Sequence, residues 1–229
     1  MHEIIQKEIE ALRNEADAAI QAYFSLKTVH ELMATEEGLL ERMRTAAYFW
    51  ATVLHSLQCV YFLSLRKFFD PDNRSHRFDK LMKLCESHIG AFSRDALAKR
   101  REKDFPSRAE LKDYVKNAFV PPKGFFEAFK GEIYQELDRL NFRQVYRTIT
   151  DKVIAHNEVV NPQKIEELFD KTEKSEVEQI LLLMERISTE FRSLWVNGHK
   201  PDLSTTQLPL SRLVIDDVRR AIAGKTCEH

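Results

Sequence analysis

Residues 5–26 read IQKEIEALRNEADAAIQAYFSL, and this stretch decides the fold class. Apolar residues recur along it at steps of three and four, and they are Ile5, Ile9, Leu12, Ala16, Ala19, Tyr23 and Leu26. Because an α-helix turns once in about 3.6 residues, this spacing places the side chains on one helical face. The pattern predicts a long first helix that runs to about Met33.

The same periodicity continues through the rest of the chain. Thr35 is a plausible N-cap for the second helix, and serine–glutamate pairs of the capping-box type precede two later ones. The pattern between 125 and 156 fits either one helix or two helices that are broken near Asn141. The further helices are expected over roughly 37–69, 78–92, 107–119, 125–156, 175–197 and 209–222.

The overall pattern predicts an all-α protein. The chain has only six glycines and seven prolines in 229 residues, and no run alternates with a period of two for long enough to form a strand. We therefore expect a bundle of four to five long helices in a single domain, 1–229. A charged helical insert is expected at about 94–124, and a short C-terminal helix at about 209–222.

Composition and motifs exclude several classes of protein. The formal net charge of −1 gives no general attraction to nucleic acid, so phosphate contacts require a local patch. The three cysteines have neither CxxC spacing nor even pairing, and the N-terminus lacks an apolar leader; both favour the reducing cytoplasm. The chain contains no HExxH, GxGxxG or GxSxG motif. We expect no metal and no cofactor.

One segment, residues 45–65, lacks Asp, Glu, Lys and Arg and is long enough to span a bilayer. It nevertheless contains several polar side chains that hydrocarbon would penalise. A central helix that is buried on most faces is favoured over a membrane span, so we expect no membrane association. On a helical wheel, a semi-polar stripe runs along this helix, and its members are Thr52, His55, Cys59, Arg66 and Asp70.

One late helical segment gathers groups that could act on a phosphodiester. Arg143, Arg147 and Asp151 are spaced four apart, so they share one helical face. Lys152 and His156 share another face. The cations could stabilise the charge of a transition state, and the imidazole could transfer a proton.

A structural alternative stays open for these residues. Arginine–aspartate pairs four apart are common on solvated helices, and a histidine near a helix C-terminus can cap carbonyl groups. Arg66 and Asp70 form a second pair with this spacing, and Asn157 adds polar atoms after His156. The second pair could be a helix–helix contact, or it could form the wall of a site that faces His156.

Two of these stretches together resemble a known family. LRKFFD (65–70) follows a long apolar helix, and DKVIAHNE (151–158) ends a later helix. They are similar to the HEPN superfamily, in particular to its abortive-infection U-like (AbiU-type) branch, and the resemblance covers most of residues 1–197. It implies a helical bundle, usually dimeric, with frequent metal-independent endoribonuclease activity in toxin–antitoxin or antiphage systems.

The functional signature of this family is an arginine, four to six residues, and then a histidine. His156 matches the histidine and Asp151 matches a polar position after the arginine, but Thr150 occupies the arginine position. Arg147 lies one turn earlier, and on an ideal helix it points about 180° away from His156. Either Arg147, Lys152 or Arg66 rebuilds the site, or catalysis has been lost.

The resemblance therefore implies two alternative functions. In the first, the protein is an endoribonuclease in which His156 transfers a proton and Arg147 stabilises the phosphorane. In the second, an inactive helical dimer binds a nucleotide, RNA or a partner protein. The expected partners are a second copy of the chain, RNA, and an antitoxin or nucleotidyltransferase-type protein. The supporting residues are expected to be Arg66, Asp70, Asp151, Lys152 and Asn157.

Overall fold

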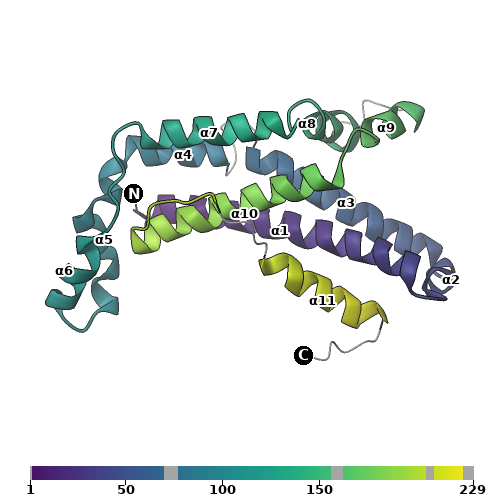
Figure 1. Ribbon diagram of the computed structural model, residues 1–229, viewed down its shortest axis with the longest axis horizontal. Coiled ribbons are helices and arrows are strands. Elements are labelled where there is room, and N and C mark those ends of the chain that lie inside the picture. The colour runs from purple at the N-terminus through teal and green to yellow at the C-terminus, as the bar shows by residue number, and fades with distance from the viewer. Residues whose placement is uncertain (1, 70–76, 156–161, 205–208, 224–229) are drawn as a thin grey trace.

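The computed structural model consists of helices joined by short connections (Figure 1). It describes residues 2–69, 77–155, 162–204 and 209–223. Every regular element within these ranges is helical and none is a strand, which confirms the all-α prediction. The division into one domain stays a prediction.

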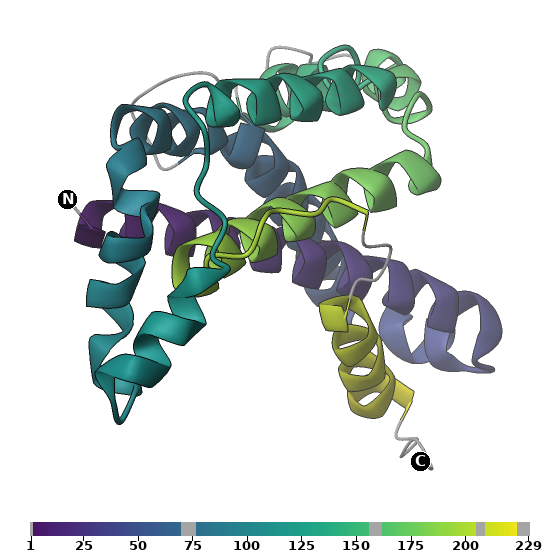
Figure 2. The same ribbon diagram turned by 60° about the vertical axis from the view of Figure 1, so that its left-hand side comes forward.

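Five helices of at least 15 residues form the bundle, as the periodicity predicts. They are α1 (His2–Thr35), α3 (Ala47–Phe69), α7 (Phe125–Arg139), α10 (Lys174–Asn197) and α11 (Pro209–Ala223). Helix α1 lies in the centre, where it packs against α3, α10 and α11 (Figures 1 and 2). Helix α7 lies above it, beside α4 (Phe78–Ser87).

Small side chains allow α1 to be packed on several sides at once. Ala16 and Ala19 are completely buried, and Ala22 is nearly so. A methyl side chain lets a neighbouring helix approach closely, and interaxial distances between packed helices are about 8–10 Å. The first helix therefore acts as the axis around which α3, α10 and α11 assemble.

The expected second helix is divided into two. Helix α2 (Leu39–Arg44) and α3 are separate, and Gly38 precedes α2 in the left-handed conformation with φ of 73°. The prediction that Thr35 is an N-cap is wrong. Thr35 is the last residue of α1, and its hydroxyl donates to the carbonyl of Glu31.

The prediction that the uncharged helix is buried on most faces is wrong for its first half. Tyr48 and Phe49 are 93% and 61% exposed, and Val60 is 41% exposed. Burial becomes extensive only from Tyr61 onward. Within the described part of the chain, no helix combines the length and apolarity that a membrane crossing requires.

The semi-polar stripe of α3 consequently lies at the surface over its first half. Thr52 and His55 are exposed, and the Nε2 atom of His55 lies 3.5 Å from the Sγ atom of Cys59. Arg66 is partly buried. The stripe therefore does not require a buried partner at its N-terminal end.

The charged insert is helical, as expected. A short 3₁₀-helix (Ile89–Phe92) leads into α5 (Arg94–Arg101), and α6 (Arg108–Lys116) follows a polar turn. The Oγ atom of Ser107 accepts a hydrogen bond from the amide of Glu110, which confirms the predicted cap. The insert has a small apolar cluster of its own, formed by Leu97, Leu111, Val115 and Ala118.

The helix is interrupted after α7, so the region 125–156 contains separate helices and not one continuous helix. Asn141 has φ of 52°, and α8 (Tyr146–Ile149) starts a few residues later. Asparagine tolerates this left-handed conformation better than most residues. Helix α9 (Pro162–Phe169) follows with proline at its first position.

The second predicted capping box is absent. Helix α10 begins at Lys174, and Ser175 lies inside it. The carboxylate of Glu178 instead accepts a hydrogen bond from the Tyr23 hydroxyl at 3.2 Å and pairs with Lys27 at 2.7 Å. These contacts hold the start of α10 against α1. The prediction of a last helix near 209–222 is confirmed by α11.

Gly198 connects the insert to the main bundle. It ends α10 with φ of 67°, and its carbonyl accepts a hydrogen bond from the amide of Phe119 at 2.7 Å. A Cβ atom at this position would lie 2.7 Å from the Cβ of Ala118 and 2.8 Å from Leu97. Only glycine fits both the conformation and the space.

We predict that Gly198→Ala destabilises the fold by about 2–4 kcal/mol, because it combines left-handed strain with overpacking. Chemical denaturation of the variant measures this change. Gly131→Ala is the matched control, since Gly131 lies inside α7 and its Cβ would contact nothing within 4 Å. That change should stabilise the protein by about 0.5–1 kcal/mol. Equal midpoints for the two variants would contradict the proposed role of Gly198.

Candidate functional site

The candidate residues lie on an irregular helix that packs against α3. Residues Thr150–Ala155, which directly follow α8, form a π-helix, η3, whose hydrogen bonds join residues five apart. Such segments occur frequently at functional sites. The angle of about 180° between Arg147 and His156 was counted on an ideal α-helix, so it does not apply across this π-helix.

Asp151 brings two arginines from different elements together. Its Oδ1 lies 2.6 Å from the Nε atom of Arg66 on α3, and its Oδ2 lies 3.5 Å from the Nε atom of Arg147 on α8. The side chains of Arg66 and Asp151 are about one-third exposed, at 29% and 31%. One carboxylate therefore holds two guanidinium groups at a solvent-accessible position.

The other predicted site residues are not part of this cluster. Lys152 is exposed, and no ion pair joins it to another described residue. Asp70, His156 and Asn157 lie outside the described residues. Their proposed roles stay predictions.

Thr150, at the position of the family's arginine, faces the core. Its side chain is 1% exposed, and its hydroxyl donates to the carbonyl of Tyr146 at 2.9 Å and contacts that of Phe62 at 3.5 Å. A guanidinium from this position would have to be buried against α3. The positive charge next to Asp151 comes instead from Arg66 and Arg147.

A cavity of about 370 Å³ lies beside Arg147. Helices α4 and α7, the end of α3 and the segment before α8 provide its walls. Its lining residues are Phe69, Asp79, Lys130, Tyr134, Phe142, Arg143 and Arg147. Phe69 and Phe142 are buried and pack edge to face, so they shape the cavity without offering a free ring for stacking.

Asp79 anchors the polar side of this cavity. Its carboxylate accepts a short hydrogen bond from the Tyr134 hydroxyl, and Lys130 pairs with it at 2.9 Å. Burial, and then this hydrogen bond, raise the pKa of Tyr134 well above its usual value. These three residues form no recognisable motif in the sequence. The four-residue spacing of Lys130 and Tyr134 was an available signal, but their contact with Asp79 depends on tertiary packing.

Arg143 and Arg147 carry positive charge to the same cavity. The guanidinium carbon of Arg143 lies 4.9 Å from the centre of the Tyr134 ring, and its Nε lies 3.5 Å from Asp138. Three cations and one carboxylate line the cavity, an excess of positive charge in the lining that Asp138 and Asp151 offset in part from outside it through long pairs with Arg143 and Arg147. Guanidinium groups bind phosphate with paired hydrogen bonds, so this arrangement suits an anionic ligand.

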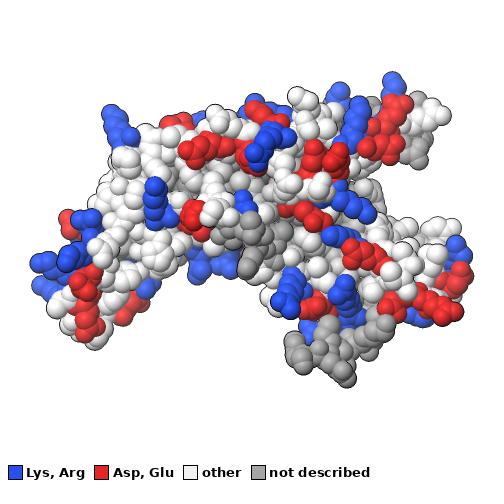
Figure 3. Space-filling model, in the orientation of Figure 1, with Lys and Arg blue, Asp and Glu red and all other residues white. Residues whose placement is uncertain are grey.

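This excess is a local property. Acidic and basic side chains alternate over the face of the molecule in Figure 3, in agreement with the net charge of −1. In the part of the chain that the structure describes, no three His, Cys, Asp or Glu side chains gather as metal ligands would.

A comparison with known families identifies the chain. The model of the AbiU2 family of HEPN proteins matches residues 3–219. The chain belongs to this HEPN family. The match confirms the resemblance seen in the sequence, and it extends beyond residue 197 to include most of α11. The chain gave no significant match to a curated protein or to a solved structure.

We predict that the two ion pairs of this HEPN protein differ in strength. A double-mutant cycle of Arg66→Gln with Asp151→Asn should give a coupling of about 1 kcal/mol, because the pair is short and partly buried. The cycle of Arg147→Gln with Asp151→Asn should give less than about 0.5 kcal/mol, because that pair is longer and more exposed. Urea unfolding measures both couplings. Equal couplings would show that Asp151 does not favour Arg66.

Proposed function

We propose that this protein is a metal-independent endoribonuclease of an abortive-infection or toxin–antitoxin system. The observation that carries the proposal is the Arg66–Asp151–Arg147 cluster beside a positively charged cavity. His156, the histidine of the family signature, follows the π-helix directly in the chain.

The proposed reaction uses the ribose as its own nucleophile. The 2′-oxygen attacks the adjacent phosphorus, a new P–O bond forms, and the bond to the 5′-oxygen breaks, which leaves a cyclic phosphate end. His156 accepts the proton of the 2′-hydroxyl while water protonates the leaving 5′-oxygen, or His156 protonates the 5′-oxygen while water accepts the proton of the 2′-hydroxyl. Arg147, with Arg66 and Lys152, stabilises the negative charge of the phosphorane. No step in this scheme requires a metal ion.

The remaining candidate residues position these groups in the proposal. Asp151 fixes the two guanidinium groups before RNA binds, and such preorganisation lowers the cost of reaching the transition state. Asp70 and Asn157 are proposed to orient neighbouring groups in the same way.

We predict that His156→Ala lowers RNA cleavage by about 100-fold or more, since general acid–base catalysis contributes about 10²–10⁴-fold. Cleavage of a labelled oligoribonucleotide is measured in EDTA. His199→Ala, which removes an exposed histidine on the segment after α10, is the matched control and should keep wild-type activity. A 2′-deoxy residue at the cleavage site should block the reaction. Equal cleavage by wild type and His156→Ala would refute the mechanism.

A second function, a non-catalytic module that binds a nucleotide, RNA or partner protein, is favoured by Thr150. The signature position is occupied by this threonine, whose side chain is buried and bonded to the Tyr146 carbonyl, so no guanidinium is available there. This alternative holds if the wild type leaves RNA intact and His156→Ala changes only binding. An antitoxin or a nucleotidyltransferase-type protein is the partner class that we propose for both functions.

We infer that two copies of the chain associate through the first half of α3. HEPN domains commonly dimerise. No charged residue occurs from 45 to 65, although Tyr48 and Phe49 are largely exposed. An exposed apolar surface of this kind is typical of an interaction site, and lack of charge suits contact between identical faces.

We predict that Phe49→Glu converts a dimer into a monomer, because two carboxylates would be brought together in an apolar contact. Light scattering after gel filtration measures the mass of each species. Val120→Glu is the matched control, because Val120 is exposed to a similar degree, at 44%, but lies on the insert. A wild-type monomer, or a Phe49→Glu dimer, would contradict this interface.

A further inference from the structure

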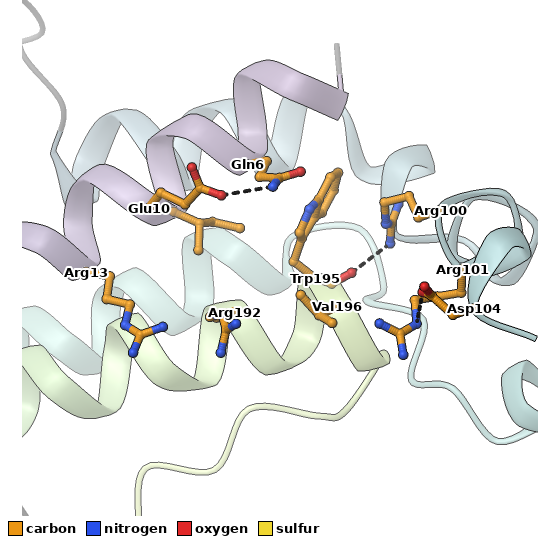
Figure 4. Close-up of a pocket in the computed structure, with 10 residues that line it drawn as sticks. Gln6, Glu10, Arg13, Arg100, Arg101, Asp104, Arg192, Trp195 and Val196 are labelled. Carbon is orange, nitrogen blue, oxygen red and sulfur yellow. Dashed lines mark hydrogen bonds and ion pairs between the residues drawn. The ribbon is translucent and has the colours of Figure 1, made fainter. Parts of the chain in front are cut away.

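A second positively charged cavity lies beside the C-terminal end of α10 (Figure 4), whereas α8 lies near the start of that helix (Figure 1). It has a volume of about 320 Å³, and helices α1, α5 and α10 provide its walls. Its arginines are Arg13, Arg100, Arg101 and Arg192. A neighbouring cavity of about 310 Å³ also contains Arg13 and Arg192 in its lining, so the two cavities form one groove. We call it the arginine groove.

Arg100 is fixed in position on the inner wall of the groove. Its two terminal nitrogens donate to the carbonyl of Ala91 at 2.6 Å and to that of Trp195 at 3.0 Å. Its guanidinium carbon lies 3.9 Å from the centre of the Trp195 ring. Burial lowers the pKa of Arg100 to about 10, so the group remains protonated at neutral pH. The groove therefore has a permanent positive charge that does not move.

Arg13 and Arg192 line the open side of the groove and can adjust to a ligand. Both side chains are exposed and come from different helices, α1 and α10. Among the described residues, Arg13 forms a long ion pair with Asp17, at 3.7 Å. Among the described residues, none forms an ion pair with Arg192. Two guanidinium groups are thus available to close on an anion from opposite walls.

The acidic residues of the lining neutralise only part of these charges. Glu10 accepts a hydrogen bond from Gln6 at 2.9 Å, and Asp104 pairs with Arg101 at 3.3 Å (Figure 4). Four arginines and two carboxylates line the groove, an excess of two positive charges that Asp17 offsets in part from outside the lining through its pair with Arg13. A ligand that matches this groove carries at least two negative charges close together.

The aromatic residue of the groove does not offer a surface for base stacking. Trp195 is 3% exposed, and Arg100 covers one face of its ring. Non-specific binding of single-stranded RNA depends on such stacking surfaces in addition to charge. The groove is consequently suited to recognise phosphates and not bases. Ser193 and Asn197 add polar groups to its neighbouring half.

We propose that the arginine groove binds a small ligand with two or more linked phosphate groups. Pyrophosphate and nucleoside diphosphates or triphosphates belong to this class. Guanidinium groups bind phosphate oxygens with two parallel hydrogen bonds, and the paired charges of linked phosphates match the excess of the groove. This site does not depend on the endoribonuclease proposal, because its residues differ from those beside Asp151.

Trp195 allows binding to be measured directly. The chain has two tryptophans, and Trp50→Phe leaves Trp195 as the single reporter. Titration of this variant with pyrophosphate should change its fluorescence with a saturating curve. In the same background, Arg13→Gln and Arg192→Gln together should weaken the affinity about 10-fold or more, since each loses charge-assisted hydrogen bonds. Calorimetry with the full chain checks the affinity, and circular dichroism checks the fold.

The control variant is Arg42→Gln. Arg42 is an exposed arginine of α2, near the other end of α1 and about 30 Å from Arg13 by helical rise. The affinity for pyrophosphate should stay unchanged in this variant and in His156→Ala. A loss in His156→Ala would place the phosphate beside the proposed nuclease site and overturn the second site.

Two further results would also overturn the proposal. Sulfate that binds as tightly as pyrophosphate would show that the groove does not select linked phosphates. A single-stranded RNA that binds here while pyrophosphate fails to displace it would assign the groove to a nucleic-acid backbone.

Discussion

The close packing around α1 is the constraint on which the rest of the structure depends. This helix contacts α3, α10 and α11, and its alanines Ala16, Ala19 and Ala22 are buried. A larger side chain at Ala16 or Ala19 would force the helices apart, and apolar side chains that are packed together in the core would lose contact with one another. The position of the arginine groove follows from this arrangement, because α1 and α10 form two of its walls, whereas α4, α7 and the end of α3 enclose the cavity beside Arg147.

The candidate site results from a difference between the two halves of α3. The second half is packed into the core, where Phe62 and Leu65 are buried and Arg66 emerges next to the π-helix. Asp151 can therefore meet an arginine that is 85 positions earlier in the chain. The first half of α3 extends beyond the core and exposes aromatic residues. One helix thus contributes both to the proposed chemistry and to the surface that we assign to a second subunit.

Periodicity predicted the elements well but could not predict their surroundings. The spacing of Ile5, Ile9 and Leu12 indicates a helix, since such a repeat matches no other regular structure. The exposure of Tyr48 was not predictable, because an uncharged sequence looks the same whether it is buried within its own chain or available to another. The capping errors at Thr35 and Ser175 arose because short cap patterns also occur inside helices.

The candidate site could be predicted only in part, because sequence spacing reveals contacts within one helix but not contacts between helices. The Arg147–Asp151 pair follows from four-residue spacing, but the contact of Asp151 with Arg66 requires knowledge of which helices touch. The π-helix has no recognised sequence signal, although it alters every angle counted across Thr150–Ala155. The cluster of Asp79, Lys130 and Tyr134 joins α4 to α7 and is visible only once these helices are placed together.

The uncharged half of α3 has a consequence for how the molecule responds to ionic strength. Contacts through an apolar surface depend on water exclusion and are not weakened by added salt, whereas contacts between arginines and phosphates are screened over about 8–10 Å. Two surfaces of this bundle therefore respond differently to added salt. High salt would separate the protein from anionic ligands while leaving a contact made through Tyr48 and Phe49 in place.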